Sequence, residues 1–383
     1  MLSKDKLLEY LSMGDRINFF GKVFSDLGIT DKVFEDGYTF DLPPCVEHTT
    51  DRLRSIIRQA IDGPIVIVNN EYSRASHAEH IEELIRSEFV NPRNVIWIHN
   101  GMAFPETPFI NIDLPMLTAI HERNFMWDLI TKGFDRPPKN QLPYASGKDV
   151  KGWAYPFSYL PGSSLAPEKS FLYLYLKSLS DENIYMDQIP NLESWSLIKE
   201  QIIDKSDCTQ SEITAMRDLY NAEKQDDLSP PEDWMYTWSD TRQQLAFWSK
   251  IPVARIDEQE AASYFNIIRE TMPLDPVQCF SEKTFKPILF GSIFINPFIK
   301  DFDLWMKMYG IQPVPELQYI TESPHMMTRL RSMMDFVNHN GMKSIGAMHD
   351  AHKDIIDQNY DFVISGDFFK HNMNRIDQYV TKV

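Results

Sequence analysis

The sequence predicts an α/β protein of two domains with a helical segment at its C-terminal end. Short, continuous apolar runs of strand length alternate with amphipathic stretches of helix length, which is the pattern of parallel sheets covered by helices. The 383 residues suit two domains, and a stretch rich in Pro, Gly, Ser and Lys over 134–168 separates two series of such runs. We therefore expect one domain over residues 1–165 and another over 166–383.

The expected first domain is an open α/β unit. A helix is predicted over Thr49–Ile61, and strands and helices then alternate: Ile65–Val68, Ser76–Phe89, Asn94–Ile98, Phe109–Asp113 and Leu117–Lys132. No G-x-G-x-x-G follows any of these strands, so the usual dinucleotide fingerprint is absent. Polar residues stand at the carboxyl ends of the strands, where α/β proteins bind ligands: Glu71, His99 and Asp113.

The expected second domain repeats this alternation. The apolar run Phe171–Leu176 is predicted to open the domain as a strand, and Tyr264–Ile268 and Ile293–Ile295 are predicted to be further strands. Helices are predicted at Asn191–Asp204, Ser211–Gln225, Thr241–Lys250, Phe302–Tyr309, Met326–Asn338, Lys343–Gln358 and Gly366–Val380.

The segment Phe280–Gly291 joins two of these strands and carries the most specific pattern in the chain. Ser281 suits a helix N-cap, Glu282 follows in the first turn, and the final glycine ends the helix. Lys283 and Lys286 are three residues apart, so one helical face can carry both cations beside the helix N-terminus. This arrangement suits a diphosphate, whereas the alternative is a surface helix with a Glu282–Lys286 ion pair.

Residues 263–300 resemble a pattern found in glycosyltransferases of phages, large viruses and some bacteria. That pattern reads FNIVTET…TEKTFKPI-FG-PFI, and here Phe265–Thr271 reads FNIIRET and Ser281–Pro287 reads SEKTFKP. Arg269 departs from it, because a small polar residue usually stands there. A similar Glu-Lys step occurs in fucosyltransferases whose two Rossmann-like domains face each other across a cleft, the GT-B arrangement.

The resemblance implies a GT-B fold with a nucleotide-sugar donor bound on the second domain. In the relatives, the acidic residue and the cations hold the donor's ribose and diphosphate. Carried over to this chain, the donor-binding residues are Glu270, Ser281, Glu282, Lys283, Thr284 and Lys286. A last helix often crosses back to the first domain in such enzymes, and Asp367–Val380 is the candidate for it.

A catalytic base is expected from the first domain. An inverting glycosyl transfer needs a base that takes the proton of the acceptor hydroxyl. The candidates are Glu71, His99 and Asp113, each of which has a structural or surface role as its alternative.

No cofactor or metal ion is expected besides the donor. The sequence has no H-E-x-x-H and no Cys/His cluster at ligand spacing. Asp301 and Asp303 form an Asp-x-Asp step, but they open a predicted helix and N-capping explains them better. His349 and His352 are three residues apart and are expected on a solvated helix face.

Three possibilities remain for the partner. Similar sequences occur in phages, so one acceptor is a hydroxymethylated pyrimidine in phage DNA; the others are a surface glycan, or no acceptor at all in a non-catalytic nucleotide-binding or structural protein. The net charge of −17 disfavours broad nucleic-acid binding, so DNA contact would be local, through Arg52, Arg54 and Arg58. A glycan would instead stack on Trp153 and Tyr155.

A cytoplasmic location is expected, in the host cytoplasm if a phage encodes the protein. No apolar run approaches the roughly twenty residues needed to cross a membrane, and the first residues contain no apolar signal region. The odd number of widely spaced cysteines, Cys45, Cys208 and Cys279, indicates a reducing compartment.

Overall fold

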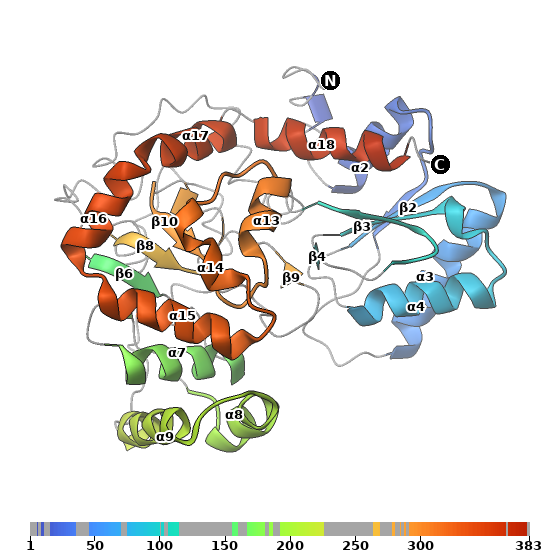
Figure 1. Ribbon diagram of the computed structural model, residues 1–383. Coiled ribbons are helices and arrows are strands. Elements are labelled where there is room, and N and C mark those ends of the chain that lie inside the picture. The colour runs from blue at the N-terminus through green and yellow to red at the C-terminus, as the bar shows by residue number, and fades with distance from the viewer. Residues whose placement is uncertain are drawn as a thin grey trace, which may run out of the picture. The chain divides into compact units, whose positions relative to one another are not determined.

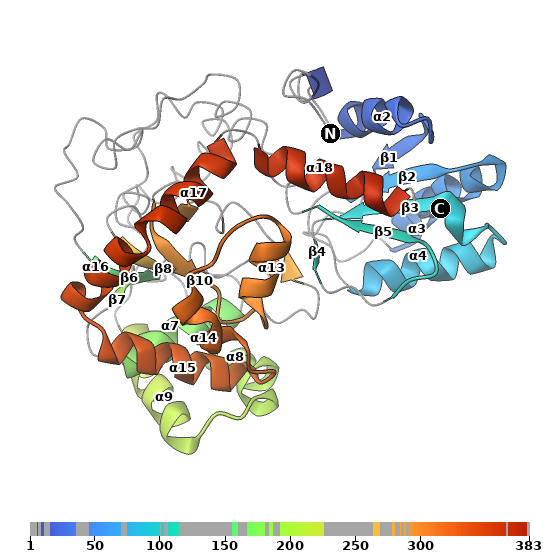
Figure 2. The same ribbon diagram turned by 45° about the horizontal axis from the view of Figure 1, so that its top comes forward.

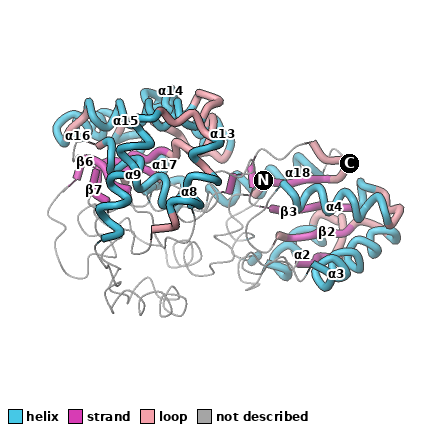
Figure 3. The backbone as a smooth tube through the Cα atoms, turned by 90° about the horizontal axis from the view of Figure 1, so that it is seen from below, coloured by secondary structure: helices cyan, strands magenta, loops and turns pink. Residues whose placement is uncertain are grey.

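Figures 1 and 3 draw the strands and helices that the computed structural model describes. The described residues are 6, 9–10, 16–35, 46–69, 75–99, 101–102, 106–114, 155–159, 167–180, 184–186, 192–225, 263–268, 278–279, 284, 287–288, 291–364 and 367–380. They form a mixed α/β structure with parallel sheets and a mostly helical C-terminal region, which confirms the predicted class. The chain divides into two compact units, Met1–Gly133 with Asp275–Glu282 and Phe362–Val383, and Phe134–Leu274 with Lys283–Asp361.

The first unit contains a sheet of four parallel strands whose spatial order follows the sequence. The strands are β1 (Val33–Glu35), β2 (Ile65–Val68), β3 (Val95–His99) and β5 (Ile110–Asp113). One row across the sheet runs through Val33, Val66, Ile96 and Ile110. β2 and β3 are buried at every position, which explains why each reads as a continuous apolar run.

Helices cover both faces of this sheet. α3 (Val46–Arg58) and α4 (Ala75–Ser87) lie on one face, and their apolar residues share a core with alternate residues of β2 and β3. α2 (Arg16–Asp26) and α18 (Asp367–Val380) lie on the other side, with α18 beside β5 (Figure 2). A short antiparallel pair of β4 (Gly101–Met102) and β9 (Gln278–Cys279) also belongs to this unit.

The second unit contains another parallel sheet of four strands, in the order β10-β8-β6-β7. Its strands are β6 (Tyr155–Tyr159), β7 (Ile184–Met186), β8 (Ser263–Ile267) and β10 (Ile293–Ile295). The chain passes from β6 to β7 on one side and then returns to β8 and β10 on the other side. The order therefore reverses between β6 and β8, and α/β sheets bind ligands outside the carboxyl ends of the strands at such a switch point.

The structure describes eight helices that lie wholly or mostly in the second unit. They are α7 (Pro167–Leu179), α8 (Trp195–Gln201), α9 (Gln210–Gln225), α13 (Phe302–Met308), α14 (Gln318–Thr321), α15 (Met326–His339), α16 (Met342–Ala351) and α17 (Lys353–Ile364). Phe336 of α15 contacts Phe157 and Phe265, with ring centroids 5.9 and 5.5 Å away. α16 contacts the sheet through Tyr264 and His349, whose ring centroids are 5.2 Å apart. Four short 3-10 turns complete the described elements: Gln59–Asp62, Pro92–Asn94, Ile203–Lys205 and Pro315–Leu317.

The predicted strand at Phe171–Leu176 is wrong, because these residues belong to helix α7. All seven residues from Ser170 to Leu176 are buried, so this part of the helix has no exposed side that polar residues would mark in the sequence. A short apolar run of this kind fits a buried helix as well as a buried strand. The strand of this sheet that precedes α7 is β6, within the stretch expected to separate the domains.

Other differences are smaller. The predicted helix Lys343–Gln358 consists of two helices, α16 and α17, which are separated at His352. The predicted helices Leu117–Lys132 and Thr241–Lys250 lie outside the described residues.

Candidate functional site

The carboxyl edge of the second unit's sheet carries a buried amide group. Ile268 follows β8, and its N–H donates to the carbonyl of Ile295 (2.8 Å) in the neighbouring strand β10. Asn296 comes next and is completely buried. Its Oδ1 accepts from the N–H of Phe298 (3.1 Å), which fixes the orientation of the amide. Within the described part of the chain, the Asn296 Nδ2 group has no acceptor, so a ligand oxygen or a water molecule is needed to satisfy it.

Arg329 of α15 fixes the turn that follows Asn296. Its guanidinium group donates to the carbonyl oxygens of Pro297 (2.8 Å), Phe298 (2.7 Å) and Ser323 (2.6 Å). Burial lowers the pKa of Arg329 to about 10, and the nearby Asp301 opposes this effect. Arg329 thus links the turn at Pro297 and Phe298, after β10, to the segment at Ser323 that precedes α15.

A buried polar pair joins the two strands at the switch point. Ser158 of β6 lies opposite Asn266 of β8, and its hydroxyl donates to Asn266 Oδ1 (2.6 Å). Both side chains are buried, so this hydrogen bond between neighbouring strands is shielded from solvent. The pair fixes β6 against β8 close to the edge where a ligand is expected.

The glycosyltransferase-like segment, residues 269–291 between β8 and β10, is described in part. Thr284, Pro287 and Ile288 are buried, and Gly291 has a positive φ of 69°. The Gly291 N–H donates to the carbonyl of Ile288 (3.1 Å), and the N–H of Ser292 donates to that of Pro287 (2.9 Å). This pair of hydrogen bonds is the Schellman arrangement, which confirms that Gly291 ends a helix. The remaining predicted donor-binding residues lie outside the described residues: Glu270, Ser281, Glu282, Lys283 and Lys286.

His99 lies at the end of β3 and is only 1% exposed. Its Nε2 is hydrogen-bonded to Oδ1 of Asn111 in the neighbouring strand β5. The ring of Trp97 lies against it, with 4.5 Å between the centroids. The structure thus places His99 within the first unit's core, between polar and aromatic neighbours.

Asp113 lies opposite His99 at the end of β5. Both of its carboxylate oxygens accept from Arg375 Nη2 of α18, at 2.9 and 3.2 Å. The two side chains are mostly buried, with exposed fractions of 14% and 9%. Sequence reasoning missed this partner because Arg375 stands 262 residues away and carries no local motif. Glu71, the third predicted base, lies outside the described residues.

The Asp-x-Asp step opens helix α13, as predicted, but without the expected capping hydrogen bond. Asp301 occupies the N-cap position of α13 with a φ of 54°, but its side chain makes no capping hydrogen bond. Asp303 is buried and its Oδ2 has no hydrogen-bond partner in the described part of the chain. Burial raises the pKa of Asp303 to about 6, with a smaller contribution from Glu322, while Lys307 opposes the shift.

His349, in α16, and His352, the C-cap of that helix, differ in their surroundings. His349 is buried, which contradicts the predicted solvated face, and its Nε2 contacts the carbonyl of Gly291 at 2.8 Å. His352 forms a pair with Glu316, with 2.8 Å between Nε2 and Oε2. Among the residues that the structure describes, no group of three or more His, Cys, Asp or Glu side chains could hold a metal ion.

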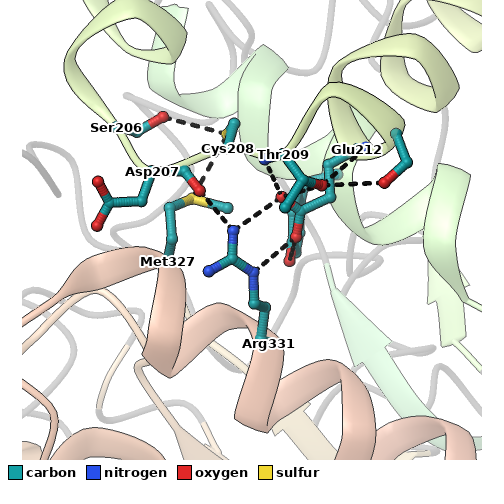
Figure 4. A network of polar contacts seen from close by, with 9 residues as sticks. Ser206, Asp207, Cys208, Thr209, Glu212, Met327 and Arg331 are labelled. Carbon is teal, nitrogen blue, oxygen red and sulfur yellow. Dashed lines mark hydrogen bonds and ion pairs between the residues drawn. The ribbon is translucent and has the colours of Figure 1, made fainter.

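A further polar network joins α9 to α15 (Figure 4). Thr209 and Glu212 form a reciprocal capping box at the start of α9, in which Glu212 Oε2 accepts from Thr209 N (2.6 Å) and Glu212 N donates to Thr209 Oγ1 (3.2 Å). Arg331 Nε and Nη2 donate to the two oxygens of Glu212, each at 2.9 Å, and Tyr175 adds a hydroxyl donor. Burial alone raises the pKa of Glu212, but these hydrogen bonds lower it to about 2. Since the carboxylate is saturated by protein donors, we assign the network a structural role.

Two of the three arginines expected to contact DNA are engaged in ion pairs. Arg54 lies 3.0 Å from Asp51 and 3.2 Å from Glu88, and Arg58 lies 2.7 Å from Glu88. Arg52 is exposed. The proposed aromatic contacts for a glycan are described only at Tyr155, which is half-buried in β6.

Comparison with known proteins gave no match to a family model, a curated protein or a solved structure. Within the described ranges, no helix combines the length and apolar character that a membrane span requires.

Proposed function

We propose that this protein is a glycosyltransferase that moves a sugar from a nucleotide-sugar donor to an acceptor hydroxyl. The observation that carries the proposal is the strand order of the second unit, β10-β8-β6-β7, with its switch point between β6 and β8. The glycosyltransferase-like segment leaves the carboxyl end of β8 and returns at the start of β10. It therefore begins at the edge where α/β sheets bind ligands.

The proposed donor site follows from this placement and from the residues of the segment. Lys283 and Lys286 bind the diphosphate beside the helix N-terminus, with Ser281, Glu282 and Thr284 in the same turn. Glu270 follows β8 and accepts hydrogen bonds from the ribose hydroxyls.

Asn296 supports a ligand at the same edge. Its Nδ2 is a buried donor without an acceptor in the described residues, and leaving such a group unsatisfied costs about 1–3 kcal/mol. A donor oxygen, or a water molecule held between the amide and the donor, removes that cost.

The proposed base belongs to the first unit, in a GT-B arrangement of two Rossmann-like domains. Asp113 and Glu71 are the carboxylate candidates and His99 is the imidazole candidate. Asp113 already accepts hydrogen bonds from Arg375, so as a base it would share its carboxylate between this partner and the acceptor hydroxyl. His99 can act as the base only if the acceptor reaches its ring, which is 1% exposed in this structure.

The proposed acceptor is a hydroxymethylated pyrimidine in DNA, bound through local cationic groups. Arg54 and Arg58 already hold Glu88, so each must exchange this partner for a phosphate. Sugar transfer to such DNA should therefore weaken as the salt concentration rises.

The first test is thermal shift against UDP-, GDP-, CMP- and dTDP-sugars. A ligand that binds only the native state raises the melting temperature, by an amount that grows with its concentration. We expect one nucleotide family to raise it and Lys283→Ala to lose the effect, whereas Lys353→Ala, a surface control paired with Asp357, retains it. If no nucleotide sugar shifts the wild-type protein, the proposed function is wrong.

A further inference from the structure

Three large apolar side chains are exposed in the described part of the first unit, and all three lie at one edge of its sheet. They are Leu27, Ile61 and Phe89, with exposed fractions of 41%, 61% and 94%. Each stands in a connection that leads from a helix to the next strand: from α2 to β1, from α3 to β2 and from α4 to β3. Since these strands are parallel neighbours, the three connections meet at the amino ends of the strands, opposite the edge where α/β sheets bind ligands. We call the three side chains the apolar edge patch.

Phe89 has a backbone conformation that a bulky residue rarely adopts. It follows α4 with a φ of 54°, in the left-handed region. Its N–H donates to the carbonyl of Arg86 (3.4 Å), and the N–H of Val90 donates to that of Ile85 (3.1 Å), which is the Schellman arrangement at the end of a helix. The left-handed position of this motif usually holds glycine, as Gly28 does at the end of α2 with a φ of 72°.

Burial within the chain does not offset the unfavourable backbone of Phe89. At 94% exposure its ring has almost no packing contact with the rest of the protein. A strained residue persists where its surroundings or its function require it, and a large exposed aromatic ring is typical of the centre of an interface. The combination indicates a contact with another molecule.

Polar contacts between two of the connections hold Ile61 and Phe89 in fixed places. Glu88, the residue before Phe89, accepts from Arg58 Nε (2.7 Å) at the end of α3. Asn94 Nδ2 donates to the carbonyl of the residue before Ile61 (2.8 Å). The two exposed side chains are thus carried by connections that are bonded to each other, so they form a preorganised surface.

The charges around the apolar edge patch favour a second copy of the chain as its partner. The three connections, residues 27–32, 58–64 and 86–94, contain the cations Lys32, Arg58, Arg86 and Arg93 and the anions Asp31, Asp62 and Glu88. The whole chain carries a charge of −17, so this nearly neutral edge is a place where two copies can approach without strong repulsion. A surface with both signs can pair with itself across a twofold axis, whereas DNA calls for cations alone.

We propose that the protein forms a symmetric dimer through the amino edge of the first unit's sheet, with Phe89 of each copy packed on the apolar edge patch of the other copy. In a twofold interface the same residues of both copies meet, and an aromatic ring often supplies much of the binding energy. The carboxyl edge of the sheet is not used, so the inference does not depend on the proposed function.

The test is sedimentation velocity of the full chain over a wide range of protein concentration, with Phe89→Gly as the main variant. Glycine suits the left-handed position, so at concentrations where both proteins are monomeric we expect Phe89→Gly to melt at the same temperature as the wild type or higher. Its dimer Kd should nevertheless rise about tenfold or more, as for the loss of an aromatic residue at the centre of an interface. Ile61→Ser should also weaken the dimer, whereas Leu304→Ser, at a similarly exposed position in the second unit, should not.

The salt dependence gives an independent readout. Salt screens the repulsion between two chains of charge −17, so the dimer should tighten as the salt concentration rises, whereas binding to DNA should weaken. A wild-type protein that stays monomeric, or a dimer that Phe89→Gly leaves unchanged, overturns the inference. So does a lower melting temperature of monomeric Phe89→Gly, because it would assign the ring a role within the chain. A monomeric wild type whose affinity for hydroxymethylcytosine DNA falls in Phe89→Gly would assign the patch to nucleic acid instead.

Discussion

Arg375 and Asp113 form an ion pair that joins α18 to the end of β5, with Arg375 Nη2 2.9 Å from one carboxylate oxygen and 3.2 Å from the other. Both side chains are mostly buried. Removing one partner of such a pair leaves the other charge in a site of low polarity.

The first prediction concerns this pair. Arg375→Met and Asp113→Asn should each lower the free energy of unfolding by about 3 kcal/mol, and the double variant should lose clearly less than the sum. Urea unfolding of the four proteins gives the coupling energy. Additive losses would mean that the pair contributes nothing beyond its separate contacts.

The network around Glu212 predicts a loss of stability in acid. Its pKa is about 2 in the folded protein, below the ordinary value of about 4.5, so its contribution is fully present above pH 4.5 and is lost as the pH falls towards 2. The shift corresponds to about 3 kcal/mol. Glu212→Gln should remove this acid dependence, whereas the exposed control Glu200→Gln should keep it. Equal acid dependence of the unfolding free energy in both variants would contradict the assignment.

Asp303 predicts the opposite dependence of stability on pH. Its pKa is raised to about 6, so the folded state binds the proton more tightly than the unfolded state, and stability falls as the pH rises from about 4 to 6. Asp303→Asn should therefore raise the free energy of unfolding at pH 7 by about 2–3 kcal/mol and change it little below pH 4. Denaturant titrations at both pH values test this, with the exposed Asp354→Asn as the control. A variant that is less stable than wild type at pH 7 would show that the ionised carboxylate has a partner.

The parts of the fold that could be predicted are those with local signals. β2 and β3 are apolar runs that end in polar residues, and Gly291 ends a helix because its positive φ suits glycine. α7 has no local signal that separates a buried helix from a strand, and β1 is only three residues long. Pairings between distant segments cannot be read from spacing at all.

The candidate site shows the same division. The segment that resembles glycosyltransferases could be located, because its residues are close together in sequence. Arg375 and His349 could not be connected to Asp113 and Gly291, because the fold alone brings each pair together. Asn296 gave no sequence signal either, since an asparagine after a strand is common in turns.

The central claim is that residues 281–286 bind a nucleotide-sugar donor, and titration calorimetry tests it most directly. The experiment measures Kd for the nucleotide sugar that most stabilises the wild-type protein, with Lys283→Ala, Lys286→Ala and the control Lys353→Ala. We expect each of the first two variants to weaken binding by about 1.5–3 kcal/mol, the contribution of a hydrogen bond to a charged group, and the control to bind as the wild type does. Unchanged affinity in both Lys283→Ala and Lys286→Ala would contradict the account and return the segment to an ordinary surface helix.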